Sequence, residues 1–119
     1  MEGKSLAKKD KLPNQITGVV IEPDGEVREI TTEDTLFALW DIIGGYVQLV
    51  SLVDGADLFC NEDGIRLKLL PNPKAQALVE TRGSYPVKGH ILGRALILGG
   101  VNHEGQSTDV PSWVMDYLS

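Results

Sequence analysis

The sequence predicts an α+β domain, in which a mostly antiparallel sheet of about six strands carries two or three short helices packed on one face. Two observations predict this class. Several short apolar or alternating segments are separated by hairpin-type turns, and only a few segments have helical apolar spacing. With 119 residues, 42% of them hydrophobic, the chain is long enough for one domain with its own core.

The first two predicted strands, residues 16–22 and 26–30, form a hairpin. They flank Pro23, Asp24 and Gly25. Proline presets φ for the turn and glycine accepts a positive φ, so this tripeptide is typical of a short bulged loop.

A helix is predicted directly after this hairpin. Thr31 and Thr32 are suited to cap its start. Its apolar stripe has helical spacing and consists of Leu36, Leu39, Trp40 and Ile43. The helix ends at Gly44 and Gly45, since glycine adopts the left-handed conformation of a C-terminal cap at the least cost.

Three more strands are predicted in the middle of the chain. Residues 46–53 are apolar and β-branched and are predicted as a central strand, and residues 57–61 follow after a turn at residues 54–55. Residues 65–69 alternate between apolar and polar side chains after a hairpin signal at residues 62–64. They are predicted as a strand with one face in water.

The last part of the chain combines helices with one buried strand. Asn72 and Pro73 are suited to the N-cap and the first position of a short helix over about residues 72–80. Residues 91–98 are almost entirely apolar and are predicted as a buried strand, followed by a polar loop over residues 99–109. A C-terminal helix is predicted from the stripe Val110, Trp113, Val114, Tyr117 and Leu118.

Charge is unevenly distributed along the chain. Residues 1–13 hold four lysines against two acidic residues, whereas the remainder holds seven Lys or Arg against fifteen Asp or Glu, a net charge of −8. We expect residues 1–15 to be a flexible basic leader and residues 16–119 to be the single folded domain. Because so acidic a body repels phosphate, no binding of duplex nucleic acid is expected.

The sequence points to the cytosol. It contains no apolar run of the length that spans a bilayer and no secretory signal, so no membrane association is expected. Its single cysteine, Cys60, fits a reducing compartment and lies in an apolar segment, where a thiol is expected to be buried and unreactive.

Residue patterns for catalysis and for cofactor binding are largely absent. His90 and His103 are far apart in sequence and have no further His or Cys at ligand spacing, and His103, Glu104 and Asp109 offer at most a weak loop site. No glycine-rich phosphate loop or nucleophile elbow occurs. We therefore expect no enzyme activity, no cofactor and no metal.

Two sets of residues are candidates for binding. Asn72 and Lys74 stand at a predicted helix start, where free N–H groups beside a cation suit an anion. Arg94 is a charge within an apolar strand, which either faces a pocket or pairs with a carboxylate. Trp113 and Tyr117 lie one helical turn apart, and they either dock on the core or form a partner-binding face.

An ordered series of short motifs is also present: Val19 to Pro23, the stretch Leu36 to Tyr46 that ends in Gly44-Gly45-Tyr46, Asn61 to Gly64, Leu70-Pro71-Asn72, and Gly93 through Gly99. Over about residues 16–105 this series resembles the domain-of-unknown-function family numbered 3846. Members of that family are small proteins of bacteriophages, plasmids and actinobacteria. The resemblance implies a phage or mobile-element accessory protein inside a bacterial cell, and it implies no known reaction.

Two functions from different classes follow. The first is a small non-enzymatic accessory protein that binds a host bacterial protein, with Trp113 and Tyr117 as its face. The alternative is a domain that binds or sequesters a nucleotide or another small anion through Asn72, Lys74 and Arg94. An exposed apolar patch would favour the first, and a concave polar pocket would favour the second.

Overall fold

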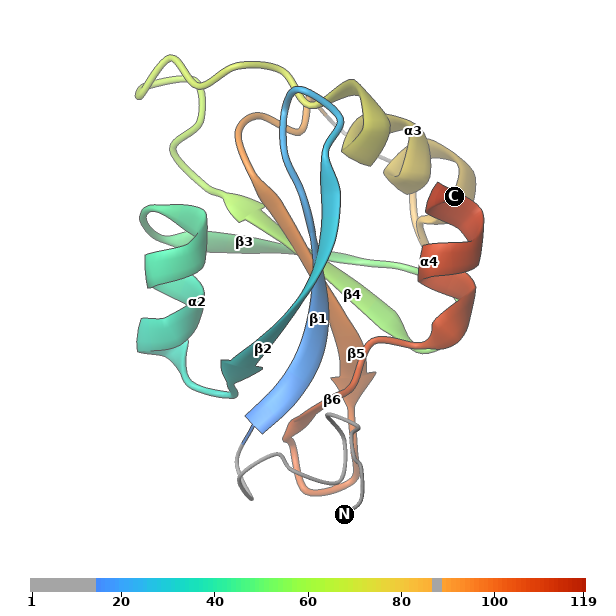
Figure 1. Ribbon diagram of the computed structural model, residues 1–119. Helices are drawn as coiled ribbons and strands as arrows, with labels where there is room; N and C mark the ends of the chain where they lie inside the picture. The colour runs from blue at the N-terminus through green and yellow to red at the C-terminus, as the bar shows by residue number, and fades with distance from the viewer. Residues whose placement is uncertain (1–14, 87–88) are drawn as a thin grey trace.

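A computed structural model describes residues 15–86 and 89–119. In this part of the chain six strands form one antiparallel sheet in the order β2-β1-β5-β4-β3, with β6 paired to β5 (Figure 1). The strands are β1 Gln15–Ile21, β2 Val27–Glu33, β3 Val47–Ser51, β4 Ala56–Asn61, β5 Ala95–Val101 and β6 Ser107–Thr108. The helices are α2 Leu36–Ile43, α3 Pro73–Arg82 and α4 Ser112–Leu118. The predicted α+β class with an antiparallel sheet is confirmed. The predicted basic leader lies outside the described residues, except for Gln15, which begins β1.

The helices cover both faces of the sheet. One buried cluster joins Val19 and Ile21 of β1 to α3 and α4, and a second joins Val20 of β1 to Leu39 and Ile43 of α2. Figure 1 shows α2 on one side of the sheet and α3 and α4 on the other. The prediction that all helices pack on one face is therefore wrong.

The physical reason for the two-sided cover lies in the central strand. In β5, Ala95 and Ile97 belong to the first cluster, while Leu96 and Leu98 belong to the second. All four side chains are fully buried. A strand that is apolar on both faces needs cover on both faces, which helices on one side alone do not supply.

The β1–β2 hairpin and the helix after it form close to their predicted positions. The Glu22 N–H donates to the Glu26 carbonyl across the turn, and Gly25 has a φ of +97°. Helix α2 begins at Leu36 instead of near residue 31, because Thr31 and Thr32 pair within the sheet as part of β2. Its N-cap is Thr35, whose hydroxyl accepts the Ala38 N–H at 3.1 Å.

Two segments between β3 and α3 differ from their predictions. β3 was predicted as central but lies at the edge of the sheet, where Gln48 and Leu49 are exposed. Residues 65–68 form turns, and the segment 65–69 pairs with none of the strands that the structure describes; Lys68 has a φ of +57°. Strand-like alternation stabilises a strand only where a neighbouring strand supplies hydrogen bonds, and none reaches this segment.

The predicted helix at Asn72 is confirmed, and the buried strand after it starts later than predicted. Asn72 caps α3 by accepting the Ala75 N–H at 3.1 Å. Before β5, residues 91–94 lie beside the segment that precedes α3, and the Gly93 N–H donates to the Leu70 carbonyl. Gly93 has a φ of +78°, a conformation that glycine adopts readily, and it turns the chain into β5.

Candidate functional site

A hollow of about 680 Å³ lies beside α2, between that helix and the loop that follows β4. We call it the α2 hollow. Its lining includes three aromatic and three charged side chains: Phe37, Trp40, Tyr46, Asp41, Asp63 and Arg66. Its volume falls in the range typical of small-ligand pockets.

The three aromatic rings of the α2 hollow contact one another edge to face. The Trp40 ring centroid is 5.5 Å from that of Phe37 and 5.1 Å from that of Tyr46, with interplanar angles of 82° and 89°. Trp40 is half-buried, whereas Phe37 is 77% exposed and Tyr46 is 60% exposed. The cluster therefore presents apolar ring surface to water.

The exposure of Phe37 follows from the geometry of its helix. Leu39 and Ile43 of α2 face the sheet, and Phe37 lies off that stripe, on the opposite side of the helix. Leu67, which is 43% exposed and lines the hollow, adds a further apolar side chain from the loop after β4. Exposed apolar side chains that gather in one region are typical of contact surfaces, while isolated ones are not.

The charges of the α2 hollow are partly matched. Arg66 Nη2 lies 2.9 Å from Asp63 Oδ2, and the Asp63 N–H donates to the Asn61 side chain at 2.7 Å. Asp41 is exposed and has no ion pair among the residues that the structure describes. The hollow therefore carries one uncompensated carboxylate.

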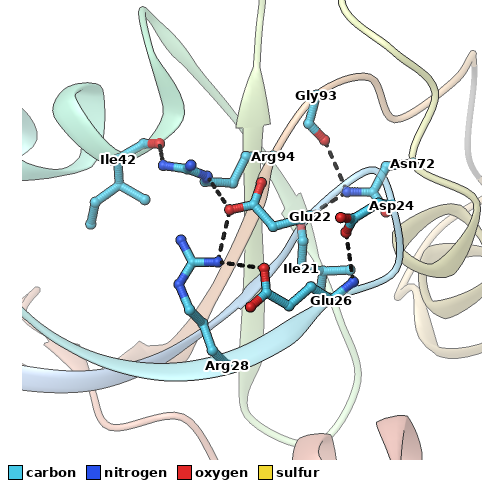
Figure 2. Close-up of polar contacts among 9 residues, drawn as sticks. All are labelled: Ile21, Glu22, Asp24, Glu26, Arg28, Ile42, Asn72, Gly93 and Arg94. Atoms are coloured by element: carbon cyan, nitrogen blue, oxygen red, sulfur yellow. Dashed lines mark hydrogen bonds and ion pairs between the residues drawn. The ribbon is translucent and has the colours of Figure 1, made fainter.

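Arg94, a predicted anion-binding residue, is held by groups of the protein. Its Nε lies 2.9 Å from Glu22 Oε2, and its Nη1 donates to the Ile42 carbonyl at 2.9 Å (Figure 2). The Nε–H is poorly aligned for a hydrogen bond, so the contact with Glu22 is best described as an ion pair. Of the two interpretations of Arg94, pairing with a carboxylate is the one that its contacts match.

Glu22 is shared by two arginines. Figure 2 shows that Glu22 also pairs with Arg28, whose Nη1 lies 2.8 Å from Glu22 Oε2. Burial by itself raises the pKa of Glu22, but the polar contacts and positive charges of Arg94 and Arg28 outweigh it. The pKa of Glu22 therefore lies below its ordinary value of 4.5.

Asn72 and Lys74 also have partners within the protein. Asn72 is 1% exposed, and its Nδ2 donates to the carbonyls of Ile21 and Gly93, both at 2.9 Å (Figure 2). Lys74 Nζ donates to the Gly25 carbonyl at 2.9 Å. Together with the cap at the Ala75 N–H, these contacts engage the whole Asn72 side-chain amide, and one donor of Lys74, with groups of the protein.

The three predicted anion-binding residues do not share one cavity. Arg94 lines a second hollow of about 460 Å³, together with Lys68 and Glu22, whereas neither Asn72 nor Lys74 lines it. Each of the three instead joins separate segments of the chain. The three residues thus lie close to β1 and β5, but they do not form one anion-binding site.

Trp113 and Tyr117 lie together on α4 and pack against the core cluster of α3 and β1. Both are half-buried. The Trp113 indole N–H donates to the Asp54 carbonyl at 2.9 Å, and the Tyr117 hydroxyl lies 2.6 Å from the Thr81 hydroxyl. Of the two interpretations given for this pair, docking on the core is the one that its contacts match.

The remaining candidates for chemistry are isolated. No group of three or more His, Cys, Asp or Glu in residues 15–86 and 89–119 is arranged to hold a metal ion. His103 and Glu104 are exposed, and Asp109 accepts the Thr17 N–H at 2.8 Å. Burial raises the pKa of Cys60 to about 11, which keeps this thiol protonated at neutral pH.

Phe37 and Tyr46 were not predicted as binding residues from the sequence, although Tyr46 belongs to the motif Gly44-Gly45-Tyr46. A signal was present, because Phe37 lies outside the stripe that buries α2 and Tyr46 follows the two glycines that end it. An aromatic residue on the outward side of a short helix has no core to enter, so it is a candidate contact residue.

The comparisons with known proteins agree with the resemblance in the sequence. The family model described as "Domain of unknown function (DUF3846)" matches residues 16–119, which includes α4. We find no match to the chain among curated proteins or among solved structures. No helix among the described residues has the length and apolar character to cross a bilayer.

Proposed function

We propose that this protein, which belongs to the family of the domain of unknown function DUF3846, is a non-enzymatic accessory protein that binds a protein of its bacterial host. The observation that carries the proposal is the exposed aromatic surface of the α2 hollow. The context of a bacteriophage or another mobile element rests on the resemblance in the sequence. A location in the host cytosol is part of the proposal, since the single cysteine suits a reducing compartment.

The residue types at the α2 hollow support a binding role. Trp and Tyr are among the most frequent anchors of protein interfaces, because their large rigid rings bury much surface with little loss of conformational entropy. Trp40 contacts two other rings, Phe37 and Tyr46, which restricts its freedom to rotate. This favours the face of α2 over that of α4, where Trp113 and Tyr117 are packed on the core.

The proposal is tested by capturing partners from lysate of a bacterial host. The tagged wild type is compared with a Phe37→Ala, Tyr46→Ala double variant, and bound proteins are identified by mass spectrometry. Tyr85→Ala is the matched control, because Tyr85 is 76% exposed and does not line the α2 hollow. Each captured protein is then purified and its affinity for all three forms is measured.

The expected result is one host protein whose affinity falls at least about tenfold in the double variant and is unchanged in Tyr85→Ala. A partner that binds all forms equally, or the lack of any purified partner, would overturn the proposed role of this surface. Loss of binding only in a Trp113→Phe, Tyr117→Phe variant would move the contact face to α4.

The alternative function is binding of a small anion, and one observation favours it. Arg94 and Lys68 line the same hollow of about 460 Å³, which places two cations beside one cavity, together with the carboxylates of Glu22 and Asp41. This function predicts that a nucleotide or another anion is released from the purified protein on denaturation. It also predicts that Arg94→Ala, in protein that remains folded, abolishes this release. Absence of any such molecule from the wild type would exclude the alternative.

A further inference from the structure

The aromatic rings of the α2 hollow leave electron-rich surface open to water. Each edge-to-face pair covers one face of one ring and the edge of the other. Because Phe37 and Tyr46 are exposed over more than half of their surface, ring face remains uncovered at the hollow. Ring faces carry partial negative charge and attract a cation that lies within about 6 Å of the ring centroid.

The carboxylates of the hollow are negative, like the faces of the aromatic rings. Asp41 and Asp63 both line it, and only Asp63 has a cation, Arg66, at ion-pair distance. The charged lining residues therefore sum to one negative charge at neutral pH. The body of the protein is acidic as well, so an approaching cation is attracted and an anion is repelled.

We infer that the α2 hollow receives an arginine side chain from a basic segment of the partner protein, an inference that rests on the proposed function. A guanidinium is planar, so it stacks on the exposed Phe37 or Tyr46 ring, each of which contacts Trp40, while its edge pairs with a carboxylate such as Asp41. A neutral apolar side chain would instead leave the Asp41 carboxylate unmatched beside the contact. The observations thus favour a cation over an apolar or an anionic group.

The protein contains the same kind of contact elsewhere. On the opposite side of the sheet, the guanidinium carbon of Arg82 lies 5.2 Å from the centroid of the Tyr117 ring. That pair occurs between α3 and α4, and it shows the spacing that an incoming arginine would adopt over an exposed ring. The α2 hollow offers comparable rings without an arginine stacked on them among the described residues.

The inference is tested with two blocked pentapeptides, acetyl-Gly-Gly-Arg-Gly-Gly-amide and its citrulline counterpart. Citrulline has nearly the shape of arginine and carries no charge. Binding to the full chain is followed by NMR through the indole N–H signals of the two tryptophans, which are assigned with a Trp113→Phe variant. The arginine peptide is expected to shift the Trp40 signal saturably and about tenfold more tightly than the citrulline peptide, and to leave the Trp113 signal in place.

Charge variants separate the carboxylate from the rings. Asp41→Asn is expected to weaken binding of the arginine peptide about fivefold and to leave the citrulline peptide unaffected. Glu29→Gln is the matched control, because it removes the same charge from an exposed position on β2 that does not line the hollow. Equal binding of the two peptides, or no shift of the Trp40 signal by the arginine peptide, would overturn the inference.

The test also separates this inference from the proposed function. A host protein whose binding needs Phe37 and Tyr46, but is unchanged by Asp41→Asn and by added salt, would leave the function standing and overturn the arginine site. Selective binding of the arginine peptide without any host partner would support the site and overturn the function as proposed.

Discussion

Arg94 Nε lies 2.9 Å from Glu22 Oε2, which ties the start of β5 to the end of β1. The same guanidinium donates through Nη1 to the carbonyl of Ile42 in the last turn of α2. Carbonyl groups in the last turn of a helix lack partners within the helix and carry partial negative charge, so a cation stabilises them. One side chain thus joins two strands and the end of a helix.

Replacing Arg94 by alanine should lower the free energy of unfolding by about 1 kcal/mol, because it removes an ion pair and a hydrogen bond that are partly shielded from water. Urea unfolding followed by far-UV circular dichroism measures this. The control is Arg66→Ala, whose pair with Asp63 is more exposed and should contribute less than about 0.5 kcal/mol. Equal effects of the two substitutions would show that Arg94 has no special structural role.

Stability should decrease in acid partly through Glu22. The pKa of Glu22 is lowered in the folded state. The contribution of its ion pairs to the free energy of unfolding is therefore fully present above the pKa of the unfolded state, and it is lost as pH falls through the lower pKa of the folded state. The difference in unfolding free energy between the wild type and Glu22→Gln should be largest above about pH 5.5 and shrink at lower pH. Urea titrations between about pH 3 and pH 7 measure it. A difference that does not vary with pH would contradict the assignment.

Asn72 should be among the most sensitive positions of the protein. Asn72→Ala leaves two buried carbonyls and one helix N–H without their partner, for an expected loss of about 2–4 kcal/mol. Asn72→Asp keeps the cap acceptor but removes both donors, so it should be nearly as harmful. Thermal unfolding compares both with Lys74→Ala, whose exposed hydrogen bond should matter little. If Asn72→Asp were neutral, the two carbonyl contacts would carry no stability.

Cys60 should be unreactive in the folded protein. It is 3% exposed and burial raises its pKa to about 11, so little thiolate forms below that pH. Ellman's reagent at pH 8 should label it only after guanidinium chloride is added. Rapid labelling of the native protein would mean that β4 opens readily.

The pair on α4 should affect stability more than binding. Tyr117→Phe removes the contact with the Thr81 hydroxyl and should cost about 1 kcal/mol. Trp113→Ala should cost about 2–3 kcal/mol, because it removes a half-buried ring from the core cluster together with its hydrogen bond to Asp54. Calorimetry measures both. A Trp113→Ala variant of unchanged stability that has lost its host partner would restore α4 as the contact face.

Local signals in the sequence predicted much of the fold. The cap at Asn72, the glycines after α2 and the turn before β2 act through their own backbones and near neighbours, so they can be recognised without the rest of the chain. The order of the strands depends on distant partners. For that reason the edge position of β3 was not predictable, and the alternation of residues 65–69 predicts a strand although none of the described strands pairs with them.

The candidate site was less predictable than the fold. Arg94 attracted attention as a charge in an apolar segment, but only the structure places Glu22 beside it. The α2 hollow combines Phe37 from a helix with Tyr46 and Asp63 from later segments. Side chains so far apart in sequence form a surface only after the sheet has brought their elements together.

The central position of β5 determines when the sheet can be completed as the chain is synthesised. The earlier hairpins, β1 with β2 and β3 with β4, share no strand pairing with each other, and both are joined through β5, residues 95–101. Until that strand leaves the ribosome, two separate ribbons each keep an unpaired edge. Assembly then requires closure between segments that lie far apart in the chain, which is slow compared with helix formation. The two hairpins therefore become one continuous sheet only after β5, which is synthesised later than both, pairs with β1 and β4 and covers one exposed edge of each hairpin.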